Sequence, residues 1–169
     1  MSIFVTVGNS KKIFPRLLNE LEKLKLYLNV PVVIQHGHTM CNFAEFTCYP
    51  FLDERCYLKF IERSDLIISH AGAGSIISAL KFKKNLILVP RQLKFDEHIN
   101  DHQLELAKFV EENGLGDVVY EIEHLKDVIT INLEKSHSMK YRSNLGKEFM
   151  INLISQKLEN LERKIRLIR

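Results

Sequence analysis

Two glycines lie between an apolar run and a segment with helical spacing of apolar residues. Gly72 and Gly74 lie between Leu66 to Ser69, which reads as a buried strand, and Ile76, which opens the helical spacing. The first turn of a helix has N–H groups without an intrahelical acceptor and carries about half a positive charge. Glycines let a ligand approach that backbone closely. The turn therefore predicts an anion site at the N–H groups of residues 73–76, and a tight turn made small only for packing is an equal alternative.

Other nucleotide-binding and hydrolytic motifs are missing from the sequence. The dinucleotide fingerprint G-x-G-x-x-G follows the first strand of its fold, whereas this turn lies in mid-chain and has Ile77 where the third glycine belongs. There is no Gly-Lys-Ser/Thr of a Walker loop and no G-x-S-x-G elbow. The sequence therefore argues against NAD binding, nucleoside triphosphate hydrolysis and serine hydrolysis.

The elements that must position this turn alternate between strands and helices. Short β-branched runs predict strands at 3–7, 30–34, 66–69 and 86–89, with a weak strand at 117–120 and loops with a short strand in the polar stretch before Pro50. Apolar residues at helical spacing predict helices at 14–28, 53–63, from 76, at 104–112, after 122 and from about 139. This order is typical of an α/β fold, a Rossmann-like open parallel sheet with helices on both faces.

Composition limits the class of protein. The chain has 169 residues, of which 46% are hydrophobic and 27% charged, as in a soluble globular protein with one domain. We expect a Rossmann-like core at 1–138 and a long C-terminal helix at 139–169. The net charge of +3 is too small to indicate nucleic acid binding. No apolar run reaches the roughly 20 residues that span a bilayer.

The three cysteines and their histidine neighbours allow two interpretations. An odd number of cysteines without a C-x-x-C pair or a secretory signal is typical of thiols in a reduced, cytoplasmic compartment. The alternative is a zinc site, for which the candidate ligands are His36, His38, Cys41, Cys48 and Cys56. Their spacing matches no standard finger or ribbon, so we expect no metal.

Several linked motifs resemble a known family. They are Ser64 to Ile76 around the glycine turn, Val89-Pro90-Arg91, His102 to Ala107, Val5 to Gly8 and Gln35-x-Gly37. In this order they resemble the C-terminal, nucleotide-sugar-binding half of family 28 glycosyltransferases, which is one half of a GT-B enzyme. The similarity is greatest to separately encoded subunits, of the bacterial PssE type and of the soluble subunit of the eukaryotic dolichol-linked UDP-GlcNAc transferase.

The resemblance implies a site for a UDP-sugar, which is the donor substrate, and no cofactor. The diphosphate would lie at the glycine turn, and the donor sugar near the His-Gln segment. The residues implied at the turn are Gly72, Ala73, Gly74 and Ser75; those at the sugar are Asn100, Asp101, His102 and Gln103. Gly8, Asn9 and Ser10 end the first strand at the same edge of the sheet and are expected at the rim. Relatives often have a ribose-binding glutamate where this chain has Ser78.

Catalysis by such an enzyme needs groups that this chain does not supply alone. His70 is a candidate for stabilising the leaving diphosphate, and a structural role in the turn is the alternative. The acceptor site and base lie in another domain of the relatives, so the resemblance implies a membrane-anchored PssD-type partner subunit and a lipid-linked saccharide acceptor. The protein would then work in the cytoplasm, peripheral to the inner face of the cell membrane.

The C-terminal residues carry an apolar stripe and a basic end. The stripe runs through Leu145, Phe149, Leu153, Leu158 and Ile165. Core packing explains such a stripe, and binding of the partner or of anionic lipid headgroups are alternatives. The sequence thus predicts the donor-binding, catalytic subunit of a two-component inverting glycosyltransferase, extending a lipid-linked glycan in exopolysaccharide or capsule biosynthesis. A non-catalytic stabilising subunit and a metal-binding regulatory domain remain the alternatives.

Overall fold

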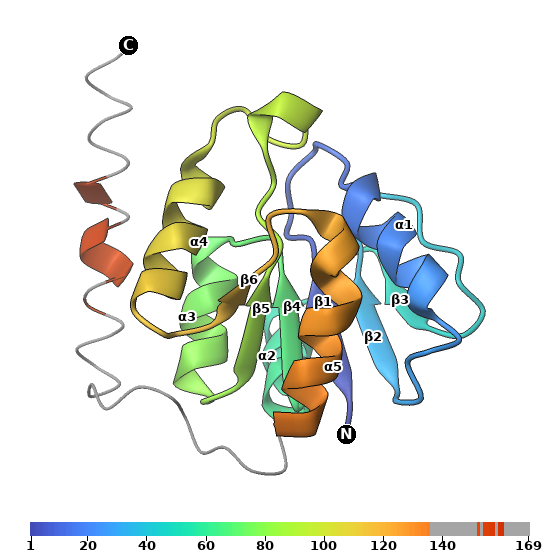
Figure 1. Cartoon of the computed structure of the whole chain (residues 1–169). Helices are drawn as coiled ribbons and strands as arrows, with labels where there is room; N and C mark the ends of the chain where they lie inside the picture. Colours follow the sequence, from blue (N-terminus) through green and yellow to red (C-terminus); the bar gives the residue numbers. More distant parts are fainter. Residues whose placement is uncertain (136–151, 153, 158, 161–169) are drawn as a thin grey trace.

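The chain folds around a six-stranded parallel sheet, shown by a computed structural model (Figure 1). The structure describes residues 1–135, 152, 154–157 and 159–160. The strands are β1 (Ile3–Thr6), β2 (Val32–Gln35), β3 (Thr47–Tyr49), β4 (Leu66–Ser69), β5 (Asn85–Leu88) and β6 (Asp117–Val118). The α-helices are α1 (Pro15–Leu24), α2 (Glu54–Arg63), α3 (Ala73–Lys81), α4 (His102–Glu112) and α5 (Leu125–Lys135), with 3-10 turns η1 (Leu93–Phe95) and η2 (Ile122–His124).

The strand order is β3-β2-β1-β4-β5-β6, and every pair is parallel. The order reverses between β1 and β4, where Ile3 pairs with Leu66 and Thr6 with Ser69. In open parallel sheets the carboxyl ends of the strands at this reversal form the usual ligand-binding crevice. The predicted Rossmann-like fold is confirmed, and the glycine turn follows β4 at this position.

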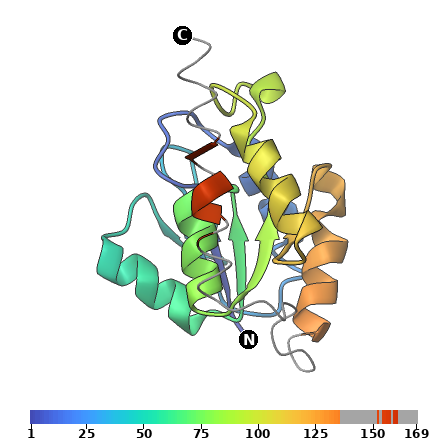
Figure 2. The same cartoon turned by 90° about the vertical axis from the view of Figure 1, so that its left-hand side faces the viewer.

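The two faces of the sheet form two hydrophobic layers. Alternate residues of β1 face opposite sides, so Ile3 and Val5 pack against α1 and α5, whereas Phe4 packs against α2, α3 and α4. Figure 1 shows α1 and α5 in front of the sheet, and Figure 2 shows α2 and α3 on the side of the sheet opposite to α5. The central strands β1 and β4 are buried on both faces, which explains why their sequences are nearly continuous apolar runs.

Two of the three cysteines are paired. Cys41 and Cys48 form a disulfide with a Cα–Cα distance of 6.4 Å, and Cys56 is free and exposed. The expectation of three unpaired thiols is therefore wrong for this pair. The two cysteines meet because β3 pairs with β2 in parallel, and the loop between these strands brings Cys41 beside Cys48 of β3.

The predicted C-terminal helix lies largely outside the described residues. Within its described part, Ile154 is completely buried in the layer that contains Ile76 and Leu106, and Lys157 lies over the ring of Phe109. Core packing therefore explains Ile154. None of the described helices is long and apolar enough to cross a membrane.

Candidate functional site

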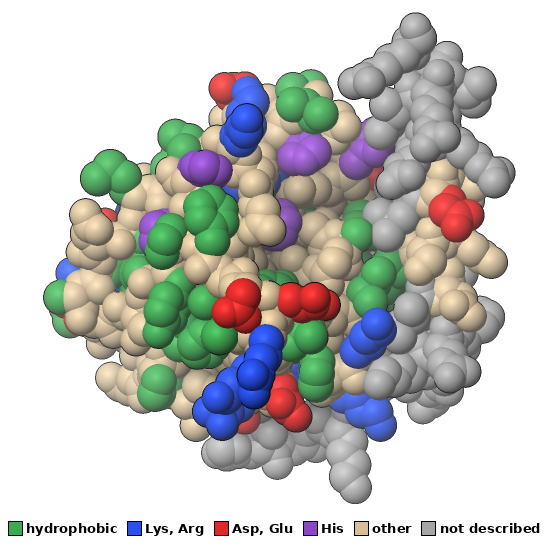
Figure 3. Space-filling model, turned by 180° about the vertical axis from the view of Figure 1, so that it is seen from behind, with side chains coloured by type: hydrophobic (Ala, Val, Ile, Leu, Met, Phe, Trp, Pro, Cys, Tyr) green, Lys and Arg blue, Asp and Glu red, His purple; other side chains and the backbone are tan. Residues whose placement is uncertain are grey.

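A cavity of about 450 Å³ opens at the carboxyl edge of the sheet, within the range of roughly 300–1,000 Å³ typical of small-molecule sites. It lies among the ends of β1, β2 and β4, the start of α3 and the first turns of α2. The lining residues are Thr6, Gly8, Asn9, Gln35, Leu52, Glu54, Tyr57, Leu58, His70, Gly72, Gly74, Ser75 and Ser78. Figure 3 shows this hollow on the face opposite to that of Figure 1, with acidic side chains below it and histidines above.

The N-terminus of α3 forms one wall of the cavity. Gly72 is the N-cap and has no side chain to cap the helix, so the N–H groups of Ala73, Gly74 and Ser75 have no acceptor among the described residues. Ile76, which the sequence also placed among the free donors, donates to Gly72 O at 3.1 Å. A Cβ added at Gly74 would meet nothing within 4 Å. Gly74 and Ser75 line the cavity, whereas the predicted site residue Ala73 lies outside the lining. Unpaired amides and a positive helix end at the cavity wall suit an anion.

His70 occupies the space beside two of the glycines. A Cβ at Gly72 would lie 2.2 Å from His70 Nε2, and one at Gly8 would lie 2.5 Å from it. Gly8 also has a φ of +76°, which L side chains rarely adopt. Gly72 is thus small because of the imidazole, whereas Gly74 is the position that leaves room for a ligand.

The imidazole of His70 is neutral. Burial, followed by the charge of Arg91, lowers its pKa to about 4, although a bond to Thr6 opposes this shift. Nδ1 lies 3.2 Å from Thr6 O, and because a carbonyl can only accept, Nδ1 carries the proton and Nε2 the lone pair. A lone pair beside the glycine turn counts against His70 as a donor to the leaving diphosphate at neutral pH. It suits a hydroxyl donor instead.

A polar network forms the floor between the turn and β2. Gln35 accepts from Thr6 Oγ1 and donates through Nε2 to Asn9 Oδ1 at 3.0 Å and to Gly8 O at 3.3 Å. The hydroxyl of Tyr57 bonds to the side chains of Thr6 and Ser75, and burial raises its pKa. These bonds fix the loop after β1 and connect α2 to the start of α3.

The segment predicted to bind the sugar does not line the cavity. Asn100 Oδ1 accepts from His102 N, Asp101 Oδ1 accepts from Leu93 N at 2.9 Å, and Gln103 Oε1 accepts from Arg91 N at 3.2 Å. These acceptors hold the loop between β5 and α4. Ser10 also lies outside the lining and accepts from Lys12 N.

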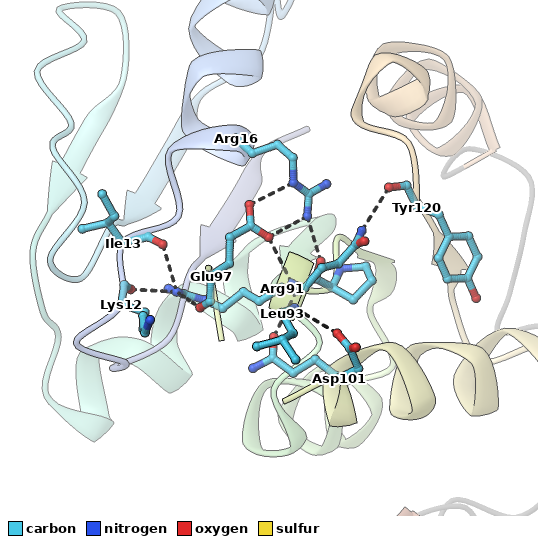
Figure 4. Close-up of polar contacts among 11 residues, drawn as sticks. Lys12, Ile13, Arg16, Arg91, Leu93, Glu97, Asp101 and Tyr120 are labelled. Atoms are coloured by element: carbon cyan, nitrogen blue, oxygen red, sulfur yellow. Dashed lines mark hydrogen bonds and ion pairs between the residues drawn. The ribbon is translucent and has the colours of Figure 1, made fainter. Parts of the chain in front are cut away.

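Arg91 joins the loops after β1 and β5 (Figure 4). Its side chain is fully buried and donates to the carbonyl oxygens of Val7, Lys12, Ile13 and Glu97. Burial lowers its pKa to about 10, so it stays charged at neutral pH. Glu97 in turn accepts two bonds from Arg16 and one from Gln92 N. The sequence motif that contained Arg91 thus serves to position the rim of the cavity.

Six lining residues were missed by sequence reasoning. Thr6 and Gln35 end apolar strands, and their polarity at carboxyl ends is a signal that could have found them. Leu52, Glu54, Tyr57 and Leu58 carry no such signal, because only tertiary packing brings α2 beside the glycine turn. Among the described residues, no three His, Cys, Asp or Glu side chains meet in a way that could hold a metal ion.

The strand order and the cavity at its reversal define an α/β domain of the Rossmann type. The comparison with known families is more specific, since residues 2–164 match the glycosyltransferase family 28 C-terminal domain. The chain belongs to this family.

Similar proteins include both separate subunits and longer enzymes. The UDP-N-acetylglucosamine transferase subunit ALG13 of Candida albicans is 41% identical over 75 residues, which cover 44% of this chain and 24% of that protein. Human ALG13 is 44% identical over 123 residues, which cover 66% of this chain and 10% of that protein. A third similar protein, from Opitutus terrae, is a UDP-N-acetylglucosamine–N-acetylmuramyl-(pentapeptide) pyrophosphoryl-undecaprenol N-acetylglucosamine transferase. It is 31% identical over 114 residues, which cover 66% of this chain and 29% of that protein. The matches span less than a third of these relatives.

Solved structures share the fold. Acinetobacter baumannii MurG aligns with a TM-score of 0.56 at 18% identity, covering 92% of this chain and 50% of that one. The solution structure of ALG13 aligns with a TM-score of 0.52 at 20% identity, covering 86% of this chain and 90% of that one. The fold is therefore that of one half of a GT-B glycosyltransferase.

Proposed function

We propose that this chain is the donor-binding, catalytic subunit of a two-component inverting glycosyltransferase. It would transfer a hexose or N-acetylhexosamine from a UDP-sugar to a lipid-linked acceptor in polysaccharide biosynthesis. The observation that carries the proposal is the set of unused amides at the start of α3, of which those of Gly74 and Ser75 belong to residues that line a cavity of about 450 Å³. Family membership and the printed names of the relatives, which are UDP-N-acetylglucosamine transferases, support it.

The residues divide the chemistry between binding and orientation. The amides of Ala73, Gly74 and Ser75 would bind the diphosphate and stabilise the charge that develops on it as it leaves. His70 would accept a bond from a substrate hydroxyl through Nε2 rather than donate a proton. The base that takes the proton of the acceptor hydroxyl would come from a partner chain.

Calorimetric titration with UDP tests the donor site. The Gly74→Asp variant places a carboxylate where the diphosphate would lie, so we expect UDP binding to be abolished. Asn29→Asp, at an exposed position just before β2, is the matched control for net charge and should bind as the wild type does. Absence of UDP binding by the wild-type chain at millimolar ligand, alone and with a partner subunit, would defeat the proposal.

The proposed partner is a membrane-anchored PssD-type subunit that carries the acceptor site. The solved relative MurG is twice as long as the part that this chain covers, which leaves room for such a second half. Adding this partner should convert a donor-binding chain into an active transferase. Pull-down and turnover with the co-expressed pair would check this, and turnover by the single chain would contradict it.

A non-catalytic stabilising subunit is the second candidate, because Ser78 lines the cavity where relatives often have glutamate. The reconstituted pair separates the two functions. If Gly74→Asp abolishes turnover while the two chains still copurify, the chain is catalytic. If turnover persists, the chain is a scaffold.

The proposed location is the cytoplasmic face of the membrane, where the partner would hold this chain. Disulfides are rare in that compartment, so the Cys41–Cys48 pair provides a test. Alkylation of thiols in intact cells should label both cysteines if the chain works there. A disulfide that resists alkylation would place the chain in an oxidising compartment.

A further inference from the structure

Two loops at the carboxyl edge of the sheet carry exposed apolar side chains. Residues 11–13 follow β1 and residues 93–99 follow β5, and together we call them the tip. Figure 1 shows these loops next to each other at the top of the molecule. Four large apolar side chains of the tip are solvent-exposed: Ile13 by 53%, Leu93 by 50%, Phe95 by 47% and Ile99 by 71%. Single exposed apolar residues are common, but a group of them on neighbouring loops marks a contact surface.

The two loops of the tip are fastened to each other. Arg91, just before η1, donates from Nη1 to Lys12 O at 2.7 Å. The side chains of Lys12 and Asp96 form an ion pair between the loops. The guanidinium of Arg16 lies 4.9 Å from the centre of the Phe95 ring. The exposed apolar side chains are therefore presented as one surface that needs little further ordering before it binds.

The tip has an excess of positive charge. Both of its acidic residues are neutralised, because Asp96 pairs with Lys12 and the buried Glu97 pairs with a guanidinium of α1. The next carboxylate along the chain lies outside the tip and accepts from the backbone of η1 at 2.9 Å. Lys11 and Lys94 are exposed and form no ion pair with a described residue. The apolar side chains are thus accompanied by two cations that are available to an anionic partner.

This combination favours a lipid surface over a protein surface. Lysine is depleted in protein–protein interfaces. At a bilayer, the apolar stem of a lysine packs beside the acyl chains while its ammonium group reaches the headgroups. Isoleucine, leucine and phenylalanine enter the boundary between headgroups and acyl chains, and each nearby cation adds attraction to anionic lipid.

We propose that the tip contacts an anionic lipid bilayer directly. Its four exposed apolar side chains enter the headgroup–acyl boundary, and Lys11 and Lys94 bind headgroup phosphates. The tip and the cavity lie at the same edge of the sheet, so this contact turns that edge toward the membrane. The inference goes beyond the proposed function, because lipid contact requires neither a donor nucleotide nor a partner subunit.

Sedimentation of the full chain with lipid vesicles tests the apolar part of the contact. The wild type should bind vesicles of equal parts phosphatidylglycerol and phosphatidylcholine, and bind pure phosphatidylcholine at least about tenfold more weakly. The double variant Leu93→Ser/Phe95→Ser should bind the anionic vesicles at least about tenfold more weakly than the wild type. The matched control is Leu26→Ser/Tyr27→Ser, an exposed pair after α1 at the opposite edge, which should bind as the wild type does.

A charge variant tests the electrostatic part independently of apolar contact. Lys94→Gln should bind the anionic vesicles about fivefold more weakly at low ionic strength. Salt screens exposed charges, so this difference should disappear at about 1 M salt. Lys81→Gln, an exposed lysine at the end of α3, is the matched control and should change nothing.

Three results would overturn the inference. They are absence of wild-type binding to the anionic vesicles, unchanged binding by Leu93→Ser/Phe95→Ser, and equal losses for this variant and its control. If the wild type ignores vesicles and the double variant instead loses a partner subunit on copurification, the tip is a protein interface. The UDP titration is separate, because none of the substituted residues lines the cavity. Failure of the wild type to bind UDP would remove the proposed function and leave the lipid contact standing.

Discussion

His70 and the glycines around it form one packing unit. The ring is held by Thr6 O and fills the space beside Gly8 and Gly72, while Gly74 faces the open cavity. The two glycines of the turn therefore have different reasons for being small. Gly72 leaves space for the imidazole of His70, whereas Gly74 leaves the N-terminus of α3 accessible to a ligand.

Alanine substitutions should separate these two reasons. Gly72→Ala forces a methyl group into the His70 ring and should lower the free energy of unfolding by about 1–3 kcal/mol. Gly74→Ala meets no neighbour and removes a glycine from a helix, so stability should be unchanged or rise by up to about 1 kcal/mol. Urea unfolding measures both. Equal changes in the free energy of unfolding for the two substitutions would contradict the different roles assigned to Gly72 and Gly74.

The buried ring of His70 should make stability depend on pH. Its pKa is lowered from 6.5 to about 4 in the folded state, so the unfolded chain binds the proton more tightly. The stabilisation is complete above about pH 7 and is lost as the pH falls from about 6.5 to about 4, by about 3 kcal/mol.

Unfolding free energies at pH 7 and pH 5 test this prediction. Arg91 and His98 are the charged or titratable groups that act on the His70 ring. Both remain in the control variant His70→Asn. This variant should show a smaller loss between the two pH values than the wild type. NMR titration of the His70 ring in the folded protein should show no protonation above pH 5, and a midpoint near pH 6.5 would contradict the account.

At the scale of elements, Arg91 fixes the loops that border the cavity. One guanidinium satisfies carbonyl oxygens from the loop after β1 and from the loop after β5 (Figure 4). Because these carbonyl groups lie outside the strands and helices, the bonds from Arg91 take the place of the ladder bonds that the strands use. The position of Gly8 and Asn9 at the rim thus depends on a residue outside the cavity lining.

Replacing Arg91 should loosen both loops together. Arg91→Met leaves several buried carbonyl groups without donors, so we expect a loss of at least about 3 kcal/mol in the free energy of unfolding. Hydrogen exchange should increase in residues 8–13 and 91–97 more than in the strands. Arg55→Met, at an exposed position on α2, is the control. Uniform exchange changes would indicate that Arg91 serves general stability alone.

The same elements show what sequence patterns could and could not predict. The spacing of Leu17, Leu21 and Leu24 predicts α1, and all three are buried as a one-sided apolar stripe requires. Helical spacing also predicts α2, but it does not say that Glu54 and Tyr57 face the glycine turn, since this depends on how α2 packs against α3. Likewise, the spacing of Cys41 and Cys48 does not reveal that the loop from β2 to β3 brings them together.

At the scale of the whole molecule, the site lies where the chain topology changes direction. The reversal between β1 and β4 separates their following loops, and the cavity opens between them with α2 and α3 as its walls. Its wall at the start of α3 suits the diphosphate of the proposed donor. The remaining requirement, an acceptor with its base, is assigned to a partner chain.

The central claim is that the start of α3 receives the diphosphate of the donor. Amide NMR spectra of the full chain, titrated with UDP and separately with uridine, test it most directly. The account predicts that UDP shifts the amide resonances of Ala73, Gly74 and Ser75, and that uridine, which lacks phosphates, leaves them in place. Unchanged resonances at these three residues with saturating UDP would contradict it.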